Sequence, residues 1–239
     1  MYYIILCEGK TDSVIINHIM SSEGFNYIKN DKNNYITFSL LKNQNIDYFK
    51  KGKDILMIWD VAGCDNLKTA IEKIEEVLEF SQITSVCIVI DRDLNSDEQL
   101  KEKVESWFKN EINIIENKWS DYFYVTSYKE TKKLKFLLNI VPKGKFGAIE
   151  SLIMDSIKAK SKDNNILGDR IEAFIEEIKK EDFGYLQKNR EVIKAKLGCL
   201  INIIDPERTF KDIIPILNEI DWSKESIVQE HFNKLKEYY

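Results

Sequence analysis

The segment Val86-Cys87-Ile88-Val89-Ile90, followed directly by Asp91-Arg92-Asp93, does most to define the fold. Its continuous apolar run predicts a strand that is covered on both faces, as in a parallel sheet. Two carboxylates follow where this strand would end. Asp91 and Asp93 point the same way only while the extended geometry of the strand persists, and both can then reach one cation.

A similar unit begins at the N-terminus. Tyr3 to Cys7 is an almost continuous apolar run that predicts another buried strand, and Glu8-Gly9 ends it. Thr11 or Asp12 can cap the helix that follows, whose apolar positions recur at helical spacing. The sequence therefore predicts a strand, a turn and a helix, with acidic residues at the turn.

Acidic residues from several strand ends are expected at one rim of the sheet. Ligands in open α/β sheets bind outside the carboxyl ends of the parallel strands. A third predicted strand, Ile55 to Trp59, is followed by another acid. The acids expected at the rim are Glu8, Asp12, Asp60, Asp91 and Asp93. Adjacent carboxylates repel one another without a cation, and their oxygen atoms are suitable ligands for Mg²⁺ or Mn²⁺.

The chain continues to alternate strands with helices up to about residue 141. Helices are expected at Asn66–Phe80 and from Asp97 to about Glu116, and strands at Tyr122–Ser127 and Phe136–Val141. The polar segment Phe25–Lys53 carries a candidate short strand at Tyr35–Leu41 and otherwise reads as an inserted hairpin or loop. This alternation favours an α/β fold with a mostly parallel, Rossmann-like sheet flanked by helices.

The sequence becomes almost entirely helical near Ala148. Amphipathic segments are expected at Arg170–Lys180, Asn189–Ile204 and Ile227–Tyr238. We therefore divide the chain into an α/β domain at residues 1–155 and a helical C-terminal region at residues 156–239 that packs on it.

The composition is that of a globular protein that folds throughout. Of 239 residues, 44% are hydrophobic and 31% are charged, and only 9 Gly and 3 Pro are present. The net charge is −5, so contact with nucleic acid would need a local basic patch or metal ions that screen the phosphates.

Cysteine usage and the N-terminal sequence bear on location. The cysteines at positions 7, 64, 87 and 199 lack the close pairs of zinc or redox motifs, which favours reduced thiols. The N-terminal apolar run has no basic region before it and is far shorter than the roughly 20 residues of a membrane helix. We expect a cytoplasmic protein without a membrane partner.

The two acidic motifs, Glu8-Gly9-Lys10-Thr11-Asp12 and Asp91-Arg92-Asp93, resemble those of the TOPRIM domain. This is the catalytic fold of type IA and type II topoisomerases, bacterial primases, OLD-family nucleases and small ribosomal-RNA maturation nucleases. The resemblance covers residues 1–155. It implies a TOPRIM-like, Rossmann-like sheet with a magnesium site.

The resemblance also implies roles for individual residues. Glu8 would act as a general acid or base, or would help to hold metal, while Asp91 and Asp93 would bind Mg²⁺. Asp12 matches the acidic position of the nuclease-like members. Lys10, inside the first motif, is the best single candidate for contacting a phosphate.

The whole layout is similar to an uncharacterised bacterial TOPRIM-like family with a helical C-terminal extension. The matching segments are Ile58-Trp59-Asp60, Gly147-Ala148-Ile149-Glu150 and Lys194-Ala195-Lys196-Leu197. The glycine that often follows the paired aspartates in topoisomerases and primases is absent here. The chain also lacks room for a strand-passage domain or a primase zinc module, which disfavours those two activities.

The resemblance implies a Mg²⁺- or Mn²⁺-dependent nuclease that hydrolyses phosphodiesters of DNA or RNA, in phage defence or nucleic-acid processing. Clustered acids suffice for metal-assisted phosphoryl chemistry without a His or Ser nucleophile. The expected catalytic residues are Glu8, Lys10 and Asp12, and the expected metal ligands are Glu8, Asp91 and Asp93. Additional candidates are Asp60, Glu150, Lys143 and Lys145.

Each motif also has a structural interpretation. Asp-x-Asp alone is most often a solvated turn, and Glu-Gly-Lys-Thr-Asp a turn with a helix cap. The lysines between Lys129 and Lys145 fit a solvated face as well as a nucleic-acid track. The alternative function is a non-catalytic, metal-binding module of a nucleic-acid-associated system, whose helical region binds a protein partner.

Overall fold

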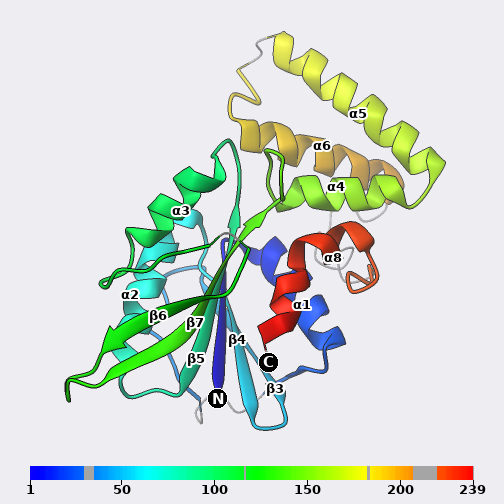
Figure 1. Ribbon diagram of the computed structural model, residues 1–239. Coiled ribbons are helices and arrows are strands. Elements are labelled where there is room, and N and C mark those ends of the chain that lie inside the picture. Colours follow the sequence, from blue (N-terminus) through cyan, green and yellow to red (C-terminus); the bar gives the residue numbers. More distant parts are fainter. Residues whose placement is uncertain (30–34, 116, 182–183, 207–219, 239) are drawn as a thin grey trace. The chain divides into compact units, whose positions relative to one another are not determined.

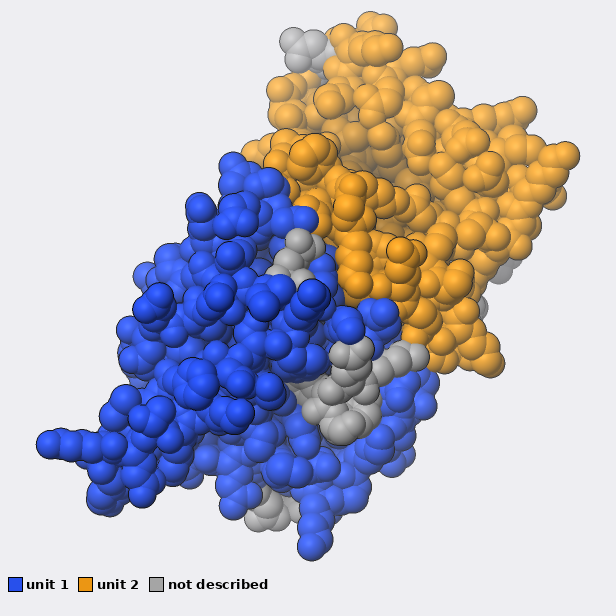
Figure 2. All heavy atoms as spheres, viewed as in Figure 1, with its two compact units in different colours: residues 1–90, 96–140, 232–239 blue, residues 91–95, 141–231 orange. Residues whose placement is uncertain are grey.

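The structure is a computed structural model that describes residues 1–29, 35–115, 117–181, 184–206 and 220–238. Two compact units are present (Figure 2). Unit 1 contains residues 1–90, 96–140 and 232–239, and unit 2 contains residues 91–95 and 141–231. These units follow spatial contacts, whereas the division at residue 155 followed the sequence pattern. The two-domain division of the sequence therefore stays a prediction.

A mixed sheet of seven strands forms the centre of the α/β fold (Figure 1), in the order β2-β3-β4-β1-β5-β7-β6. The strands are β1 (Tyr2–Cys7), β2 (Asn26–Tyr27), β3 (Asn45–Lys51), β4 (Asp54–Asp60), β5 (Ile83–Asp91), β6 (Ser120–Val125) and β7 (Thr131–Val141). Strand β1 pairs in parallel with β4 and β5, while β2, β3 and β6 form antiparallel pairs. The predicted α/β class with a Rossmann-like parallel centre is confirmed.

The parallel centre of the sheet aligns the ends of β1 and β4. Cys7, at the end of β1, is in register with Asp60 at the end of β4 and with Val89 of β5. The inner residues of these strands are almost fully buried, which explains their continuous apolar sequences. The residues that follow β1 and β4 therefore leave the sheet at the same edge.

The helices of unit 1 cover both faces of the sheet (Figure 1). They are α1 (Lys10–Ser22), α2 (Leu67–Val77) and α3 (Asp97–Glu105), with short 3₁₀ helices η2 (Cys64–Asn66) and η4 (Asn233–Tyr238). Apolar residues of α2 and α3 join one core cluster with Ile4 and Leu6 of β1. Helix α1 buries Ile15, Ile16 and Ile19 on the opposite side of the sheet.

The charged helix expected from Asp97 to about Glu116 is shorter than predicted. Helix α3 ends at Glu105, and the chain beyond it is irregular. Trp107, Ile112 and Ile114 are all buried, but in a helix Ile112 would lie on a different face from Trp107 and Ile114, which are seven residues apart. The Glu105 carboxylate accepts a hydrogen bond of 2.8 Å from the backbone of Ile114, which holds this irregular segment back against the helix.

The prediction of a short strand at Tyr35–Leu41 is wrong, because this segment contains no strand. Its aromatic residues lie over the sheet instead: Tyr35 stacks on Tyr48 of β3, and Phe38 stacks on Trp59 of β4. The strand in this region is β3, Asn45–Lys51, which the polar sequence did not reveal. This segment is therefore held on the sheet by stacking of its aromatic side chains and not by strand pairing.

Unit 2 consists mainly of helices. They are α4 (Ile149–Ala159), α5 (Lys162–Lys180), α6 (Asn189–Ile204) and α8 (Ser226–Phe232), the last ending at the border with unit 1. Gly168 allows α5 to approach α4 closely, because a Cβ atom there would lie 2.6 Å from side-chain carbons of Lys158. The predicted helical character of the C-terminal region is confirmed. In the part of the chain that the structure describes, no helix is both long and apolar enough to cross a membrane.

Candidate active site

Unit 1 gathers three of the predicted acids where β1 and β4 end. Glu8 directly follows β1, Asp12 lies in the first turn of α1, and Asp60 is the last residue of β4. Their exposed fractions are only 5%, 4% and 6%. Ionised carboxylates are rarely buried to this extent unless they are paired, hydrogen-bonded or bound to a cation.

Backbone hydrogen bonds fix the turns that carry these acids. The amide of Val61 donates to the carbonyl of Cys7 at 3.0 Å, and the amide of Gly63 donates to the carbonyl of Glu8 at 2.7 Å. The sheet pairing thus continues past the ends of β1 and β4. Gly63 has a φ of 122°, a conformation that favours glycine, so the chain can turn into η2 directly afterwards.

Asp12 and Asp60 are each held by a nearby backbone amide. The carboxylate of Asp12 accepts a hydrogen bond of 3.1 Å from Gly9, the N-cap residue of α1. The Asp60 carboxylate accepts one of 2.9 Å from Ala62. The predicted capping role of Asp12 is therefore present, although the N-cap residue itself is Gly9.

The pKa of the Cys7 thiol reflects the acidic surroundings of this site. Burial raises the pKa of its thiol well above the usual range, and the charges of Asp12, Asp60, Glu8 and Asp47 raise this pKa further. Four carboxylates of unit 1 thus act on one thiol. Burial also raises the pKa of Asp60, an effect that the Ala62 amide and the Lys10 ammonium oppose.

Asp47 is a member of this acidic group that sequence reasoning missed. It lies in β3, is 9% exposed, and contributes to the raised pKa values of Cys7 and Asp60. Its carboxylate accepts hydrogen bonds from the side-chain amides of Asn45 at 2.9 Å and Asn17 at 3.3 Å. The available signal was the alternation of polar and apolar residues in β3, which the surrounding polar sequence obscured.

Unit 2 contains the second acidic motif. Asp91 is the last residue of β5 and is 6% exposed, and its Oδ1 accepts a hydrogen bond of 2.9 Å from the backbone of Ile149, the first residue of α4. This carboxylate therefore caps a helix. Arg92 is buried, and its Nε donates to the carbonyl of Pro142 at 2.8 Å.

The extended geometry of β5 does not persist to Asp93. Its φ is +50°, and its backbone exchanges hydrogen bonds of 2.7 and 3.0 Å with Gly147. Asp93 is partly exposed, unlike Asp91. Because the left-handed conformation breaks the alternation of the strand, the sequence spacing alone does not align the two aspartates.

The additional candidates of unit 2 already have partners. Glu150 forms an ion pair of 3.7 Å with Lys194, and Lys145 pairs with Asp155. Lys143 Nζ donates to the backbone carbonyl of Glu230 at 2.9 Å. Lys143 and Lys145 line an open pocket of about 470 Å³ within unit 2.

The carboxylates of unit 1 fit a hard divalent cation by their chemistry. Carboxylate oxygens are the ligands that Mg²⁺ takes, and the negative charges of these buried carboxylates act together on Cys7. Within the described residues, no group of three or more His, Cys, Asp or Glu side chains is arranged so that it could hold a metal ion.

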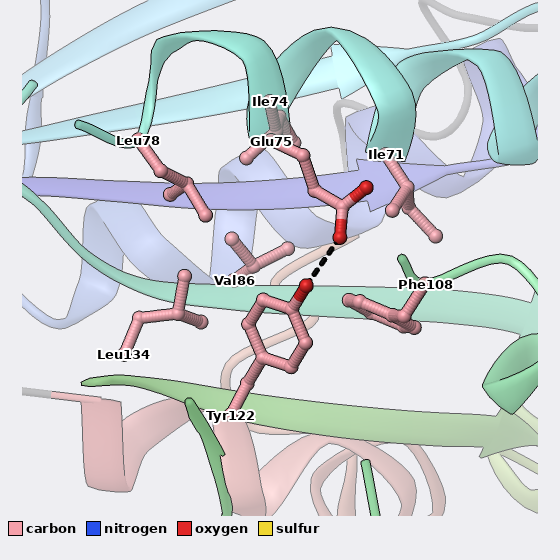
Figure 3. Close-up of a pocket in the computed structure, with 8 residues that line it drawn as sticks. All are labelled: Ile71, Ile74, Glu75, Leu78, Val86, Phe108, Tyr122 and Leu134. Carbon is pink, nitrogen blue, oxygen red and sulfur yellow. Dashed lines mark hydrogen bonds between the residues drawn. The ribbon is translucent and has the colours of Figure 1, made fainter. Parts of the chain in front are cut away.

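A separate small cavity lies between α2 and the sheet (Figure 3). Its volume is about 10 Å³, and it is lined mainly by apolar residues of α2, β5, β6 and β7. The Tyr122 hydroxyl donates a short hydrogen bond to the Glu75 carboxylate across it. This space holds at most about one water molecule, so it is a packing feature and not a substrate site.

Comparisons with known proteins give a family and one distant structural likeness. The crystal structure of a hypothetical protein, PH0156, from Pyrococcus horikoshii OT3 is similar over 91% of this chain and 98% of that chain, with 15% sequence identity and a TM-score of 0.46. No curated protein matches the sequence significantly. The chain belongs to the family described as protein of unknown function (DUF3226), whose sequence model matches residues 2–237.

Proposed function

We propose that this protein is a Mg²⁺- or Mn²⁺-dependent phosphodiesterase that cleaves DNA or RNA in the manner of TOPRIM nucleases. The observation that carries the proposal is the burial of Glu8, Asp12 and Asp60 where the parallel strands β1 and β4 end. A hard cation would offset this concentrated negative charge.

Glu8 and Lys10 have the chemistry that the reaction requires. Glu8 follows the strand directly, so its carboxylate can accept a proton from an attacking water or serve as a metal ligand. Lys10 is exposed at the start of α1, where its ammonium can contact a phosphate. Asp12 supports this turn through its hydrogen bond from Gly9.

A bound divalent ion would activate the water and stabilise the charge that develops on the phosphate and the leaving oxygen. By the TOPRIM resemblance, we assign metal binding to Glu8, Asp91 and Asp93. The Asp91 carboxylate, which also accepts the hydrogen bond from Ile149, is one of the groups proposed as ligands. In this proposal the protein works in the cytoplasm, where its four free cysteines stay reduced.

One observation favours the alternative, non-catalytic function. Asp91 caps α4, so at least one acid of the second motif has a structural role that needs no substrate. In that case the acids would stabilise a module that associates with nucleic acid or, through its helical region, with a protein partner.

Cleavage of a panel of single- and double-stranded DNA and RNA tests the enzyme. We expect activity with Mg²⁺ or Mn²⁺ but not with EDTA, and loss of activity in Glu8→Gln and Asp91→Asn. Glu76→Gln is the matched control, because it makes the same chemical change at an exposed position of α2. Cleavage that is absent, or equal in all four proteins, would favour the non-catalytic module.

A further inference from the structure

The β6–β7 hairpin presents one side-chain face that its own unit leaves uncovered. In this antiparallel pair Phe123 lies opposite Lys133, and Val125 lies opposite Thr131. Residues that are directly opposite project from the same face of a sheet. Phe123 is 52% exposed and Val125 is 64% exposed, and Lys133 and Thr131 are also exposed. Apolar and cationic side chains thus share one open face.

The opposite face of the hairpin is packed against the rest of unit 1. Tyr122 is 1% exposed and Phe136 is fully buried. The turn of the hairpin is tied to the segment that follows α2, because Glu79 accepts hydrogen bonds from both the amide and the hydroxyl of Ser127. In Figure 1 the two green arrows of the hairpin extend beyond α2. The open face therefore belongs to a supported projection, not to a loose loop.

Aromatic and basic residues gather on this projection. Tyr128, in the turn, is 82% exposed. Between residues 120 and 135 the chain carries the lysines Lys129, Lys132, Lys133 and Lys135, with Asp121 and Glu130 as the acids. The Asp121 carboxylate is shared by Lys135 at 2.7 Å and Lys133 at 3.4 Å. The hairpin is therefore locally basic in a chain whose net charge is −5.

We propose that this open face binds a single strand of nucleic acid, and this inference rests on the proposed nuclease function. Unpaired bases would stack on the rings of Phe123 and Tyr128, while Lys133 and Lys135 would contact the phosphates. Exposed rings with cations beside them suit bases and phosphates together. A duplex keeps its bases inside, so it would use the lysines but not the rings.

Binding to a fluorescent 20-nucleotide single strand, followed by anisotropy, tests the surface. The Glu8→Gln background in EDTA prevents cleavage, so binding is measured by itself. We expect Phe123→Ala with Tyr128→Ala to weaken binding at least fivefold, since each stacked base contributes measurably. The control is Tyr185→Ala, which removes an aromatic ring that is 74% exposed in unit 2. It should bind like the parent.

Salt dependence tests the lysines separately. Each phosphate contact to a single strand contributes about −0.7 to the slope of log affinity against log salt concentration. We therefore expect Lys133→Gln with Lys135→Gln to reduce the magnitude of this slope by about 1.4. The control pair, Lys50→Gln with Lys53→Gln, changes two exposed lysines at the β3–β4 hairpin and should leave the slope unchanged.

The possible outcomes distinguish a failure of the proposed binding surface from a failure of the proposed nuclease function. If the hairpin variants bind like the parent, the surface is wrong even where native protein cleaves nucleic acid. If native protein does not cleave but the hairpin variants lose binding, the surface stands and the nuclease fails. If the ring substitutions convert a dimer into a monomer in sedimentation and leave binding unchanged, the face pairs two copies of the chain, and the proposal is overturned.

Discussion

The Asp91 carboxylate accepts a hydrogen bond of 2.9 Å from the backbone amide of Ile149. This contact joins the end of β5 to the first residue of α4, 58 positions later in the sequence. A residue assigned to metal by its motif thus also caps a helix. Substitutions at Asp91 can separate the two roles, because asparagine keeps the acceptor oxygen while alanine does not.

Asp91→Asn should abolish cleavage and leave the free energy of unfolding nearly unchanged, since asparagine caps helices about as well as aspartate. Asp91→Ala should lower the free energy of unfolding by about 1 kcal/mol in addition to abolishing cleavage. Urea denaturation and the cleavage assay, run on both variants, give the two readouts. An Asp91→Asn protein that folds normally and still cleaves would remove Asp91 from the proposed metal site.

Asp60 should make the stability depend on pH. Its folded-state pKa is raised by burial, so the folded protein retains a proton that the unfolded chain has already lost. Stability therefore falls as the pH rises through the window between the ordinary aspartate pKa and the raised one, and below that window this cost vanishes.

Asp60→Asn should accordingly unfold less readily than native protein at pH 7 in EDTA, and the gain should shrink toward pH 4. Asparagine retains the acceptor for the Ala62 amide, so the change removes only the charge. Asp65→Asn, at an exposed position, is the control. Urea denaturation across this pH range measures the difference, and a gain that does not vary with pH would contradict the assigned cause.

The Tyr122 hydroxyl and the Glu75 carboxylate form a hydrogen bond beside the small cavity of Figure 3. Tyr122→Phe should lower the free energy of unfolding by about 1.5–3 kcal/mol, because the lost bond is to a carboxylate and its surroundings are apolar. Tyr124→Phe loses a longer bond, of 3.3 Å, to the Leu78 carbonyl and should cost less. Equal effects of the two substitutions in chemical denaturation would contradict this ranking.

Gly147 is required at its position for two separable reasons. Its φ is +143°, and a Cβ atom would lie 2.6 Å from the Ser151 hydroxyl oxygen. Gly147→Ala should therefore destabilise the protein by more than about 1 kcal/mol. Gly144→Ala also introduces a side chain at positive φ, but with nothing within 4 Å, so its smaller cost measures backbone strain alone. Thermal unfolding compares the two; a Gly147→Ala protein as stable as Gly144→Ala would exclude a clash.

Local sequence pattern predicted the parallel centre of the sheet. The apolar runs of β1, β4 and β5 are continuous because both faces of these strands are covered, so burial is visible directly in the sequence. Helix α6 begins and ends where its periodicity predicted, at Asn189 and Ile204. The end of α3 was missed, because Val104, Trp107 and Ile114 recur at helical spacing although the chain beyond Glu105 is irregular.

The candidate site was predictable only in part. Glu8, Asp12 and Asp60 could be found because each lies at or next to the end of a strand or the start of a helix that the pattern reveals. Asp47 was missed, because the polar sequence around β3 obscured the short alternation of polar and apolar residues that marks this strand. Its effect on Cys7 and Asp60 exists only after the sheet has formed.

The sequence by itself determined the fold class, the strands at the centre of the sheet and the acids that follow them, because these depend on local hydrophobic periodicity. Tertiary structure alone decided that Asp91 caps α4, that Asp93 adopts a left-handed conformation against Gly147, and that Asp47 joins the acids of unit 1. Each of these depends on hydrogen bonds or electrostatic interactions between residues far apart in the chain, which no local pattern encodes.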